Sequence, residues 1–327
     1  MGNKKIKHLK GRKSKNKKLK RIFSTLFSFL FILVLFILVL LAGLKYAKEM
    51  YMAKNIEDSK IEFYMDVADE VGKEKIQLNW KELLAVDMII YNGDLSGVKK
   101  SDALSRAKKF IKYSKDKFGE WNYTLHTLDE ILEKHNFTEN QKSEVKKNLK
   151  NLEYVFLGNK KLNEKSPEVV FINKIKNIAI KNYEEYGILP SITIGQCILE
   201  SGWGNSELAK NGNNLFGIKA DSSWNGDSVN MTTSENYDDK IVAAFRSYSS
   251  IDESIKDHGK FLKENPRYEK SGLFSAKHYT SQAQALEDAG YSTKEDKYGN
   301  KIYADILINL IRRYNLQLID CELYENK

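Results

Sequence analysis

The stretch ILESGWGNSELAKNGNNLFGIKA, residues 198–220, places one isolated acid, Glu200, at the end of an apolar run with helical spacing. The backbone dipole is negative at the last turn of a helix, so a carboxylate is disfavoured there. Leu199 and Trp203 flank Glu200 with apolar bulk, which also disfavours its charged form. Both effects predict a raised pKa for Glu200, as a proton donor near neutral pH needs. On position alone, a surface glutamate at a frayed helix end is the open alternative.

The residues that follow Glu200 favour a sugar-binding cleft. Aromatic rings offer flat faces for a pyranose, and amides supply hydrogen-bond donors and acceptors. The candidate aromatic residues are Trp203, Phe216 and Trp224, and the candidate amides are Asn213 and Asn214. Gly202 and Gly204 would let another chain approach closely. Aromatics and amides beside one isolated acid indicate a sugar cleft rather than a protein core.

Two helices that begin at prolines are predicted to position this segment. Ser166 and Pro167 combine a capping residue with proline at the first helical position, and the helix is expected to stop at Gly187. Pro190 begins a second helix, which is expected to end near Ser201 because two glycines follow. Later helices are expected at 251–262, 281–289 and 303–314.

The C-terminal region is predicted to be mainly α with one β-hairpin. Strand-like alternation occurs there only at 229–233 and 241–248. The hairpin turn is expected at Asp238, Asp239 and Lys240. We assign a linker to 158–168 and a domain to 169–320.

Residues 61–157 are predicted to form a small helical accessory module without strands. Apolar residues recur there at three- and four-residue intervals, including 80–91 and 103–113. Two capping boxes, at 127–130 and 138–141, predict further helix starts. The acids of this module are expected on solvated helix faces, and nothing in it suggests chemistry.

The positive charge of the chain is concentrated at its N-terminus. The 327 residues carry a formal net charge of +9, and residues 1–21 hold eleven Lys and Arg but no acid. Without these eleven, 42 of the 53 basic residues remain against 44 acidic ones, so residues 22–327 carry about −2. The basic excess is a tail, which argues against nucleic-acid binding by the folded part.

Residues 22–44 are predicted to be a transmembrane anchor. They contain no charged residue and, at about 1.5 Å per residue, can cross a hydrocarbon core of about 30 Å. A cleavable signal peptide is the alternative, but its apolar region is usually about 7–15 residues and no convincing cleavage site follows. The basic tail, 1–21, is expected in the cytoplasm and the bulk of the chain outside. A helical stalk is expected at 45–60.

Two cysteines, Cys197 and Cys321, could pair or stay as buried thiols, and their separation in sequence does not decide between these outcomes. The histidines are scattered, without the spacing of metal ligands. We therefore expect no metal and no organic cofactor.

Several motifs occur in order along the chain: LPSITIGQCILESGWG (189–204), NNLFGIKA (213–220), FRSYSSIDESIKDH (245–258), NPRY (265–268), AGYST (289–293), then Tyr303-Ala304. This series resembles the signature of bacterial peptidoglycan N-acetylglucosaminidases, glycoside hydrolase family 73. The resemblance implies a lysozyme-like α fold, hydrolysis of the β-1,4 bond after N-acetylglucosamine in peptidoglycan glycan strands, and Glu200 as the general acid.

A glycosidase usually needs a second carboxylate, about 5–5.5 Å from the first for retention and about 6.5–9.5 Å for inversion. By resemblance to the family this acid is Glu235, carried by a hairpin that is expected to move. The alternative is attack by the N-acetyl oxygen of the substrate, aligned by a tyrosine such as Tyr291. Tyr291 and Tyr303 are both expected to line the cleft, although the segment between them is longer than the family pattern.

Two other functions stay open. A muramidase or lytic transglycosylase would share the fold and the single acid, and its products would distinguish it. A non-catalytic wall-binding scaffold is the other possibility, although such a protein has no reason to keep both Glu200 and Glu235.

Overall fold

The computed structural model describes residues 26–44, 56–158, 162–235 and 239–325, and the chain divides into two units, 1–55 and 56–327. In the first unit, the helix Leu26–Leu44 is long and apolar enough to cross a membrane, by length and composition alone. The predicted basic tail lies outside the described residues, as does most of the predicted stalk.

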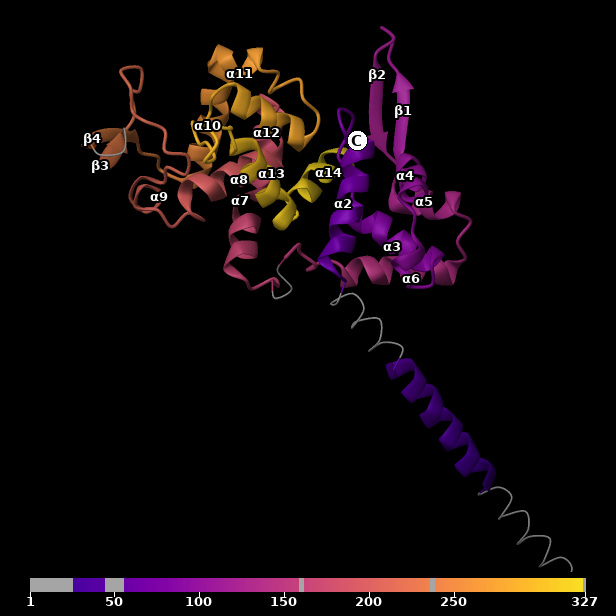
Figure 1. The fold of residues 1–327 in the computed structure, drawn as a ribbon. Helices are drawn as coiled ribbons and strands as arrows, with labels where there is room; N and C mark the ends of the chain where they lie inside the picture. Colours follow the sequence, from indigo (N-terminus) through magenta and orange to yellow (C-terminus); the bar gives the residue numbers. More distant parts are fainter. Residues whose placement is uncertain (1–25, 45–55, 159–161, 236–238, 326–327) are drawn as a thin grey trace, which may run out of the picture. The chain divides into compact units, whose positions relative to one another are not determined.

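The second unit begins with a group of helices around a buried core (Figure 1). The helices are α2 (Asp58–Gly72), α3 (Trp80–Ile90), α4 (Lys100–Lys108), α5 (Leu128–Lys134) and α6 (Glu139–Asn151), with a short 3-10 helix, η1, at Leu95–Gly97. Trp80 is fully buried at the centre of this core. Both predicted capping boxes are confirmed, because Thr127 and Thr138 each exchange hydrogen bonds with the residue three positions later.

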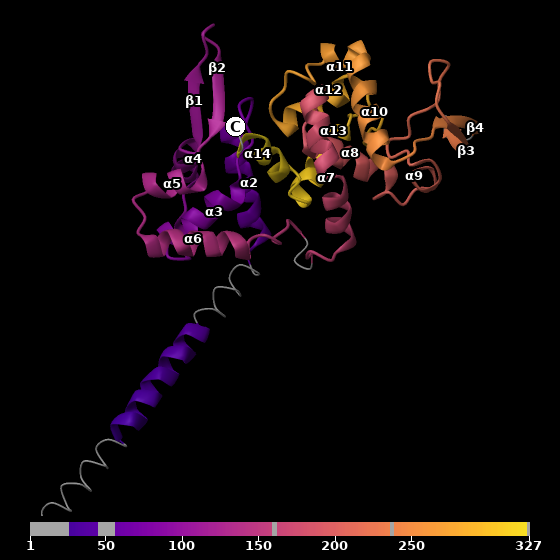
Figure 2. The ribbon, with the colours of Figure 1, turned by 180° about the vertical axis from the view of Figure 1, so that it is seen from behind.

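The prediction that 61–157 contains no strands is wrong. A hairpin, β1 (Ile111–Lys115) and β2 (Trp121–Leu125), stands out from these helices in both ribbon views (Figures 1 and 2). The predicted helix at 103–113 is also wrong beyond Lys108, where α4 ends. The physical reason is that aromatic and β-branched residues alternate in both strands, and Gly119, at φ +87°, permits the turn.

The remaining helices form a second core, and their mainly α character confirms the predicted fold class. They are α7 (Pro167–Tyr186), α8 (Pro190–Ser201), α9 (Glu207–Gly212), α10 (Ile251–Glu264), α11 (Pro266–Lys270), α12 (Tyr279–Asp288), α13 (Tyr303–Arg313) and α14 (Gln317–Glu325). The predicted ends, at Gly187 for α7 and near Ser201 for α8, are confirmed, and the capping glycines Gly187 and Gly202 adopt the left-handed conformation.

Helix α8 is the central element of this core and packs against α7, α12, α13 and α14 (Figure 1). Every residue from Pro190 to Ile198 is buried. At Gly195 an added Cβ would come within 2.7 Å of Leu307 Cδ1, so α8 and α13 approach closely only because this residue is glycine. The close packing fixes the end of α8, where Glu200 lies.

The predicted C-terminal hairpin is present as β3 (Ser228–Glu235) and β4 (Asp239–Arg246). The predicted turn is too long, because Asp239 pairs with Glu235 and Lys240 with Ser234 inside the ladder. Asp238 lies outside the described residues.

Several contacts join the two cores of residues 56–327. Tyr279 Oη donates to Asp69 Oδ2 at 2.6 Å, and Asn315 Nδ2 donates to the carbonyl of Val155 at 2.8 Å. Cys197 and Cys321 are both buried and neither is in a disulfide, so the thiol alternative is the one observed.

Candidate active site

Glu200 lies in the last turn of α8, where α13 brings Tyr303 against it. The Tyr303 hydroxyl donates to Glu200 Oε1 at 3.3 Å and accepts from Gln196 Nε2 at 3.1 Å. Gln196 lies one helical turn before Glu200, so both side chains share a face of α8. Because Tyr303 is only 4% exposed, the core fixes the position of this carboxylate oxygen.

The surroundings of Glu200 raise its pKa. Burial is the largest cause, while the hydrogen bond from Tyr303 and the charge of Lys294 act in the opposite direction. The residue as a whole is exposed, because its side chain faces protein on one side and solvent on the other. Solvent therefore weakens the shift of the Glu200 pKa, and the buried part of the side chain sets its upward direction. The direction is the one that a proton donor requires.

A chain of ring contacts runs from Tyr303 through Tyr291 and His258 to Phe216. The ring centroids of Tyr291 and Tyr303 are 5.2 Å apart, and Tyr291 Oη is 3.5 Å from His258 Nε2. His258 stacks on Phe216 with centroids 3.7 Å apart, and burial lowers the pKa of His258 to about 3. A neutral imidazole therefore connects the two aromatic residues. Phe216 is itself buried in this stack, and its contact with sugar stays a prediction.

Trp203 lies two residues beyond the end of α8, after Gly202, and adopts the left-handed conformation at φ +62°. Its ring makes edge contacts with Phe171 at 5.9 Å and with Tyr314 at 4.7 Å between centroids. A bulky residue in this conformation is strained, and these contacts hold it there. Trp203 is half-buried, so part of its surface is still available to a substrate, and its binding role stays a prediction.

The two predicted amides bind the backbone of their own domain. Asn213 Nδ2 donates to the carbonyl of Tyr248 at 2.8 Å. Asn214 is 1% exposed, and its Nδ2 donates to the carbonyls of Ile218 and Arg246 at 3.0 and 2.9 Å. Both amides thus tie the loop after α9 to the end of the hairpin, and substrate contact by either one stays a prediction.

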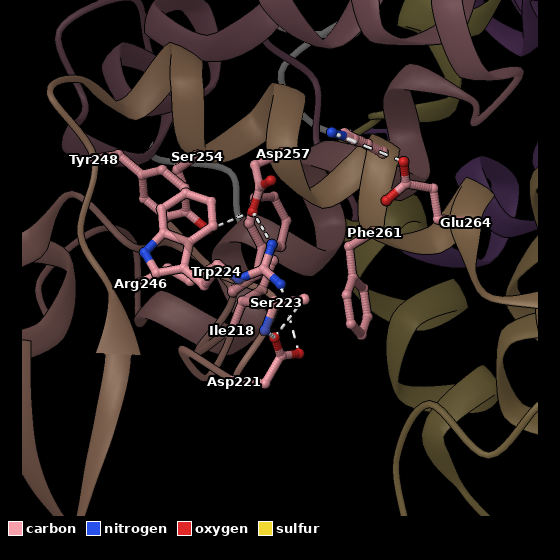
Figure 3. A network of polar contacts seen from close by, with 12 residues as sticks. Ile218, Asp221, Ser223, Trp224, Arg246, Tyr248, Ser254, Asp257, Phe261 and Glu264 are labelled. Carbon is pink, nitrogen blue, oxygen red and sulfur yellow. Dashed lines mark hydrogen bonds and ion pairs between the residues drawn. The ribbon is translucent and has the colours of Figure 1, made fainter. Parts of the chain in front are cut away.

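Polar contacts anchor the inner end of the β3–β4 hairpin (Figure 3). Arg246 Nη1 donates to Asp257 Oδ2 at 2.8 Å, and Tyr248 Oη donates to the same oxygen at 2.7 Å. The Arg246 guanidinium lies 4.6 Å from the ring centroid of Trp224, whose indole nitrogen donates to the carbonyl of Asp227 at 2.9 Å. Trp224 therefore supports the hairpin through Arg246, and its predicted sugar contact is untested.

Glu235 is the last residue of β3, far along the strand from this anchor. Ser228 pairs with Arg246 at the inner end, and Glu235 pairs with Asp239 at the outer end. At about 3.3 Å per residue, the strand carries Glu235 roughly 23 Å from Ser228. The structure describes the backbone of Glu235 and not its side chain.

The structure brings together Glu200, Tyr303 and Tyr291, and Phe216 joins them through His258. Asn213, Asn214 and Trp224 gather at the hairpin base instead. Trp203 packs against Phe171 and Tyr314, and Glu235 lies at the outer end of the hairpin. Sequence reasoning missed Gln196 and His258 as parts of this group, although the quoted motifs contain both. The four-residue spacing between Gln196 and Glu200 on α8 could have indicated Gln196. His258 could not have been found in this way, because the sequence does not show which residues of other helices α10 contacts.

Among the described residues, no group of three or more His, Cys, Asp or Glu side chains is arranged to hold a metal ion. The groups that meet around Glu200 are a carboxyl, an amide and two phenols. Such a set can donate a proton and bind a polar ligand.

The family model described as Mannosyl-glycoprotein endo-beta-N-acetylglucosaminidase, or Glucosaminidase, matches residues 176–316. That segment contains Glu200, Glu235, both tyrosines and the whole hairpin. This part of the chain belongs to the glucosaminidase family. It is therefore a glycoside hydrolase domain.

Named relatives agree with this family. The chain is 39% identical to "Exo-glucosaminidase LytG" of Bacillus subtilis over 167 residues, 49% of this chain and 56% of that protein. It is 41% identical to "Peptidoglycan hydrolase FlgJ" of Vibrio parahaemolyticus over 143 residues, 42% of this chain and 46% of that protein. The chain thus spans about half the length of these curated relatives.

Among solved structures, the chain is similar to the catalytic domain of the autolysin Auto from Listeria monocytogenes. The identity is 30%, with 56% of this chain and 98% of that domain covered and a TM-score of 0.42.

Proposed function

We propose that this chain is a membrane-anchored cell-wall hydrolase that cleaves the β-1,4 bond following N-acetylglucosamine in peptidoglycan. The observation that carries the proposal is the family match over the segment in which Tyr303 and Gln196 position Glu200. The relatives are named as a glucosaminidase and a peptidoglycan hydrolase, which supports the same substrate.

In this proposal Glu200 protonates the oxygen of the leaving sugar. Its place at the negative end of α8 and its crowding by protein both favour the protonated acid in the resting enzyme. When the proton leaves, the Tyr303 hydroxyl stabilises the new carboxylate by the hydrogen bond that it already makes. Tyr303 is thus suited to both protonation states of Glu200.

Glu235 is the proposed second carboxylate, acting as the base that activates water or as the nucleophile. The hairpin is anchored at its inner end, so bending toward a bound glycan would carry the outer end through the largest displacement. The alternative is substrate assistance, in which the N-acetyl oxygen attacks and Tyr291 orients it. The two routes differ in how much activity depends on Glu235.

The proposed location is the cytoplasmic membrane, with the basic N-terminal tail inside and the hydrolase domain outside. The apolar helix Leu26–Leu44 and the eleven basic residues before it support this topology. Protease added to wall-stripped cells should remove the hydrolase domain and leave the anchor protected. Recovery of a mature chain that starts near Gly43 or Lys48 would contradict the anchor.

The test of the activity is mass spectrometry of muropeptides that the purified chain releases from cell wall. Reducing-end N-acetylglucosamine is the expected product. Reducing-end N-acetylmuramic acid would identify a muramidase instead, and an anhydro end would identify a lytic transglycosylase. No product from wall or from short glycans would leave the non-catalytic scaffold as the explanation.

The matched control for this assay is Glu207→Gln, because Glu207 is an exposed glutamate in the first turn of α9. It lies seven residues after Glu200 in the sequence and makes no contact in the group around Tyr303. Glu207→Gln should digest wall like the parental chain.

A further inference from the structure

An open groove of about 790 Å³ lies beside the β1–β2 hairpin of the accessory module. Glu200 does not line it. Its lining comes from α2, α4, both strands and α5: Val71, Lys75, Lys108, Lys109, Ile111, Lys112, Tyr113, Trp121, Tyr123, His126 and Lys134. Five lysines and three large aromatics thus share one groove, and none of its lining residues is acidic.

The lysines give this groove a positive charge that is only partly neutralised. Glu130 pairs with Lys112 at 2.8 Å and reaches His126 at 3.2 Å. Within the part of the chain that the structure describes, no ion pair is found for Lys75, Lys108 or Lys109, and all three are exposed. Since residues 22–327 are near neutral as a whole, this local charge is a distinct feature.

The aromatic residues form a row on one face of the hairpin. Tyr113 lies directly opposite Tyr123, and Trp121 lies opposite Lys115 two residues further along, which places all four on the same face. Tyr113 is 70% exposed and Trp121 is 52% exposed. Exposed rings of this size at an edge strand are costly to solubility, so a ligand that covers them is the expected reason for their presence.

We propose that this groove binds an anionic sugar polymer of the cell wall and holds the enzyme on it. Flat rings at the hairpin suit pyranose faces, and the lysines at the ends of α4 and α5 suit repeated carboxylate or phosphate groups. The proposal rests on the proposed function only in taking the wall as the surroundings of the chain. The module would thus supply retention, and the hydrolase domain would supply chemistry.

The test compares two triple variants of the full chain in detergent, pelleted with purified cell wall at 4 °C. Lys75→Ala/Lys108→Ala/Lys109→Ala removes the three groove lysines for which no ion pair is found among the described residues. Lys99→Ala/Lys150→Ala/Lys165→Ala removes three exposed lysines outside the groove and is the matched control. The groove variant should bind wall about tenfold more weakly at low salt, since each exposed charge contact is a modest one. The control should bind like the parental chain.

Two further measurements, the salt dependence of binding and the substitution Trp121→Ala, sharpen the test. Binding by the parental chain should weaken as salt rises, and this dependence should be shallower for the groove variant. Trp121→Ala should weaken binding several-fold without changing the salt dependence, because it removes a ring and no charge. Trp121 is exposed, so the variant should keep the parental far-UV spectrum and melting temperature.

Binding to untreated wall, to wall without phosphate polymers and to anionic vesicles identifies the source of the anionic groups. If removal of phosphate polymers from the wall by hydrofluoric acid abolishes the difference between groove variant and control, the ligand carries phosphate. If the difference persists, the ligand carries carboxylate, and both results support the groove. Equal binding by both triple variants would overturn the proposal, and so would parental binding to anionic phospholipid vesicles but not to wall.

Turnover of a short soluble glycan separates this inference from the proposed activity. The groove variant should cleave such a glycan at the parental rate, because none of its three positions contacts the group around Glu200. If the parental chain cleaves nothing but the groove variant still loses wall binding, the activity proposal fails and the groove stands. If the parental chain cleaves the glycan and the groove variant binds wall like the parental chain, the groove proposal fails and the activity proposal stands.

Discussion

The two carboxylates proposed for catalysis are held in different ways. Glu200 lies in the last turn of a helix that is buried from Pro190 to Ile198, and one of its oxygens accepts a hydrogen bond from a core tyrosine. Glu235 ends a strand of a two-stranded hairpin whose described anchors are at the opposite end. The core therefore determines where Glu200 lies, whereas the contacts described for the hairpin hold only the end opposite to Glu235.

This difference has a physical basis. A two-stranded hairpin is marginally stable alone and depends on what it packs against. Here the strand ends near Arg246 are bound to Asp257 of α10 and to the loop after α9, through Asn214. The outer end has no comparable anchor among the described contacts. We expect substitutions on the core side to affect the chemical step and substitutions on the hairpin side to affect engagement of long glycans.

The largest effect should come from Glu200→Gln, which keeps the shape of the side chain and removes the proton. Activity on wall should fall by at least about 10²-fold, the usual contribution of a general acid. Wall binding and the melting temperature should be parental, because the side chain is exposed and the groove lies elsewhere. Substantial residual turnover by the purified variant would show that another group donates the proton.

Glu235→Ala should be the next largest effect and decides between the two mechanisms. If Glu235 is the base or nucleophile, most of the rate is lost and added azide should restore turnover by occupying the vacated space. If the N-acetyl group of the substrate attacks, the loss is milder and a thiazoline analogue of N-acetylglucosamine should inhibit strongly. Near-parental digestion of intact peptidoglycan would remove Glu235 from the mechanism.

Arg246→Gln tests the anchor of the hairpin. Arg246 and Asp257 are 11% and 15% exposed, so removing one partner of this ion pair should destabilise the fold by about 2 kcal/mol. Digestion of wall should fall by about tenfold, with a smaller loss on short glycans, because a loosened hairpin engages long strands poorly. The rates are compared well below the melting temperature of the variant.

The control for the anchor is Lys256→Gln, which breaks an ion pair on the same helix α10. Lys256 and Glu185 are 61% and 49% exposed, so this pair should contribute less than about 1 kcal/mol. Equal losses from Arg246→Gln and Lys256→Gln would show that the hairpin anchor has no particular role.

Much of this arrangement could be predicted from the sequence, because its signals are local. Pro167, Pro190 and the glycines after each helix fixed where α7 and α8 begin and end. The side of α8 that Tyr303 would contact could not be predicted, since it depends on how α13 packs, 103 residues away. The β1–β2 hairpin could not be predicted in this way, because β1 is short and directly follows α4, and its apolar spacing also fits a continuation of that helix.

The predicted sugar-binding residues show a second limit of sequence reasoning. Residue type indicated Phe216, Asn214 and Trp224 for a cleft, since rings and amides bind sugars. In the structure the same groups stack on His258, bind backbone carbonyls and cover Arg246. A ring or an amide satisfies either role equally well, so burial must be known before such residues are assigned to a substrate.

Tyr303→Phe should have a smaller effect on rate and a specific effect on its pH dependence. The Tyr303 hydroxyl lowers the pKa of Glu200 by donating to its charged form, so removing it should raise that pKa. The alkaline limb of the pH–rate profile, where the acid loses its proton, should move to higher pH. Tyr298→Phe is the control, because Tyr298 is 76% exposed and the contacts described for Glu200 do not include it. An unchanged alkaline limb would show that Tyr303 does not affect the pKa of the catalytic acid.

The smallest effect concerns the other end of α8, where Asp320 of α14 holds the first turn. Asp320 is fully buried and accepts from the Ser191 amide at 2.9 Å and the Ser191 hydroxyl at 2.6 Å. Burial raises its pKa to about 7, against the opposing effect of these hydrogen bonds. Between about pH 4 and 7 the folded chain therefore binds a proton that the unfolded chain has released. The stability from this group is complete below pH 4 and is lost as the pH rises through 7.

Asp320→Asn removes that titration and keeps an oxygen that can accept from Ser191. The melting temperature of the variant, relative to the parental chain, should rise by a few degrees between pH 5 and pH 8, because only the parental chain must bury a charge. Taking the difference of the two curves cancels the other groups that titrate in this range, such as Asp69, whose pKa is raised to about 6. Turnover at pH 6 should be parental, since Glu200 lies at the far end of the helix. A difference that is flat with pH would mean that Asp320 is charged throughout, and α8 would then be held by a buried anion rather than by a neutral acid.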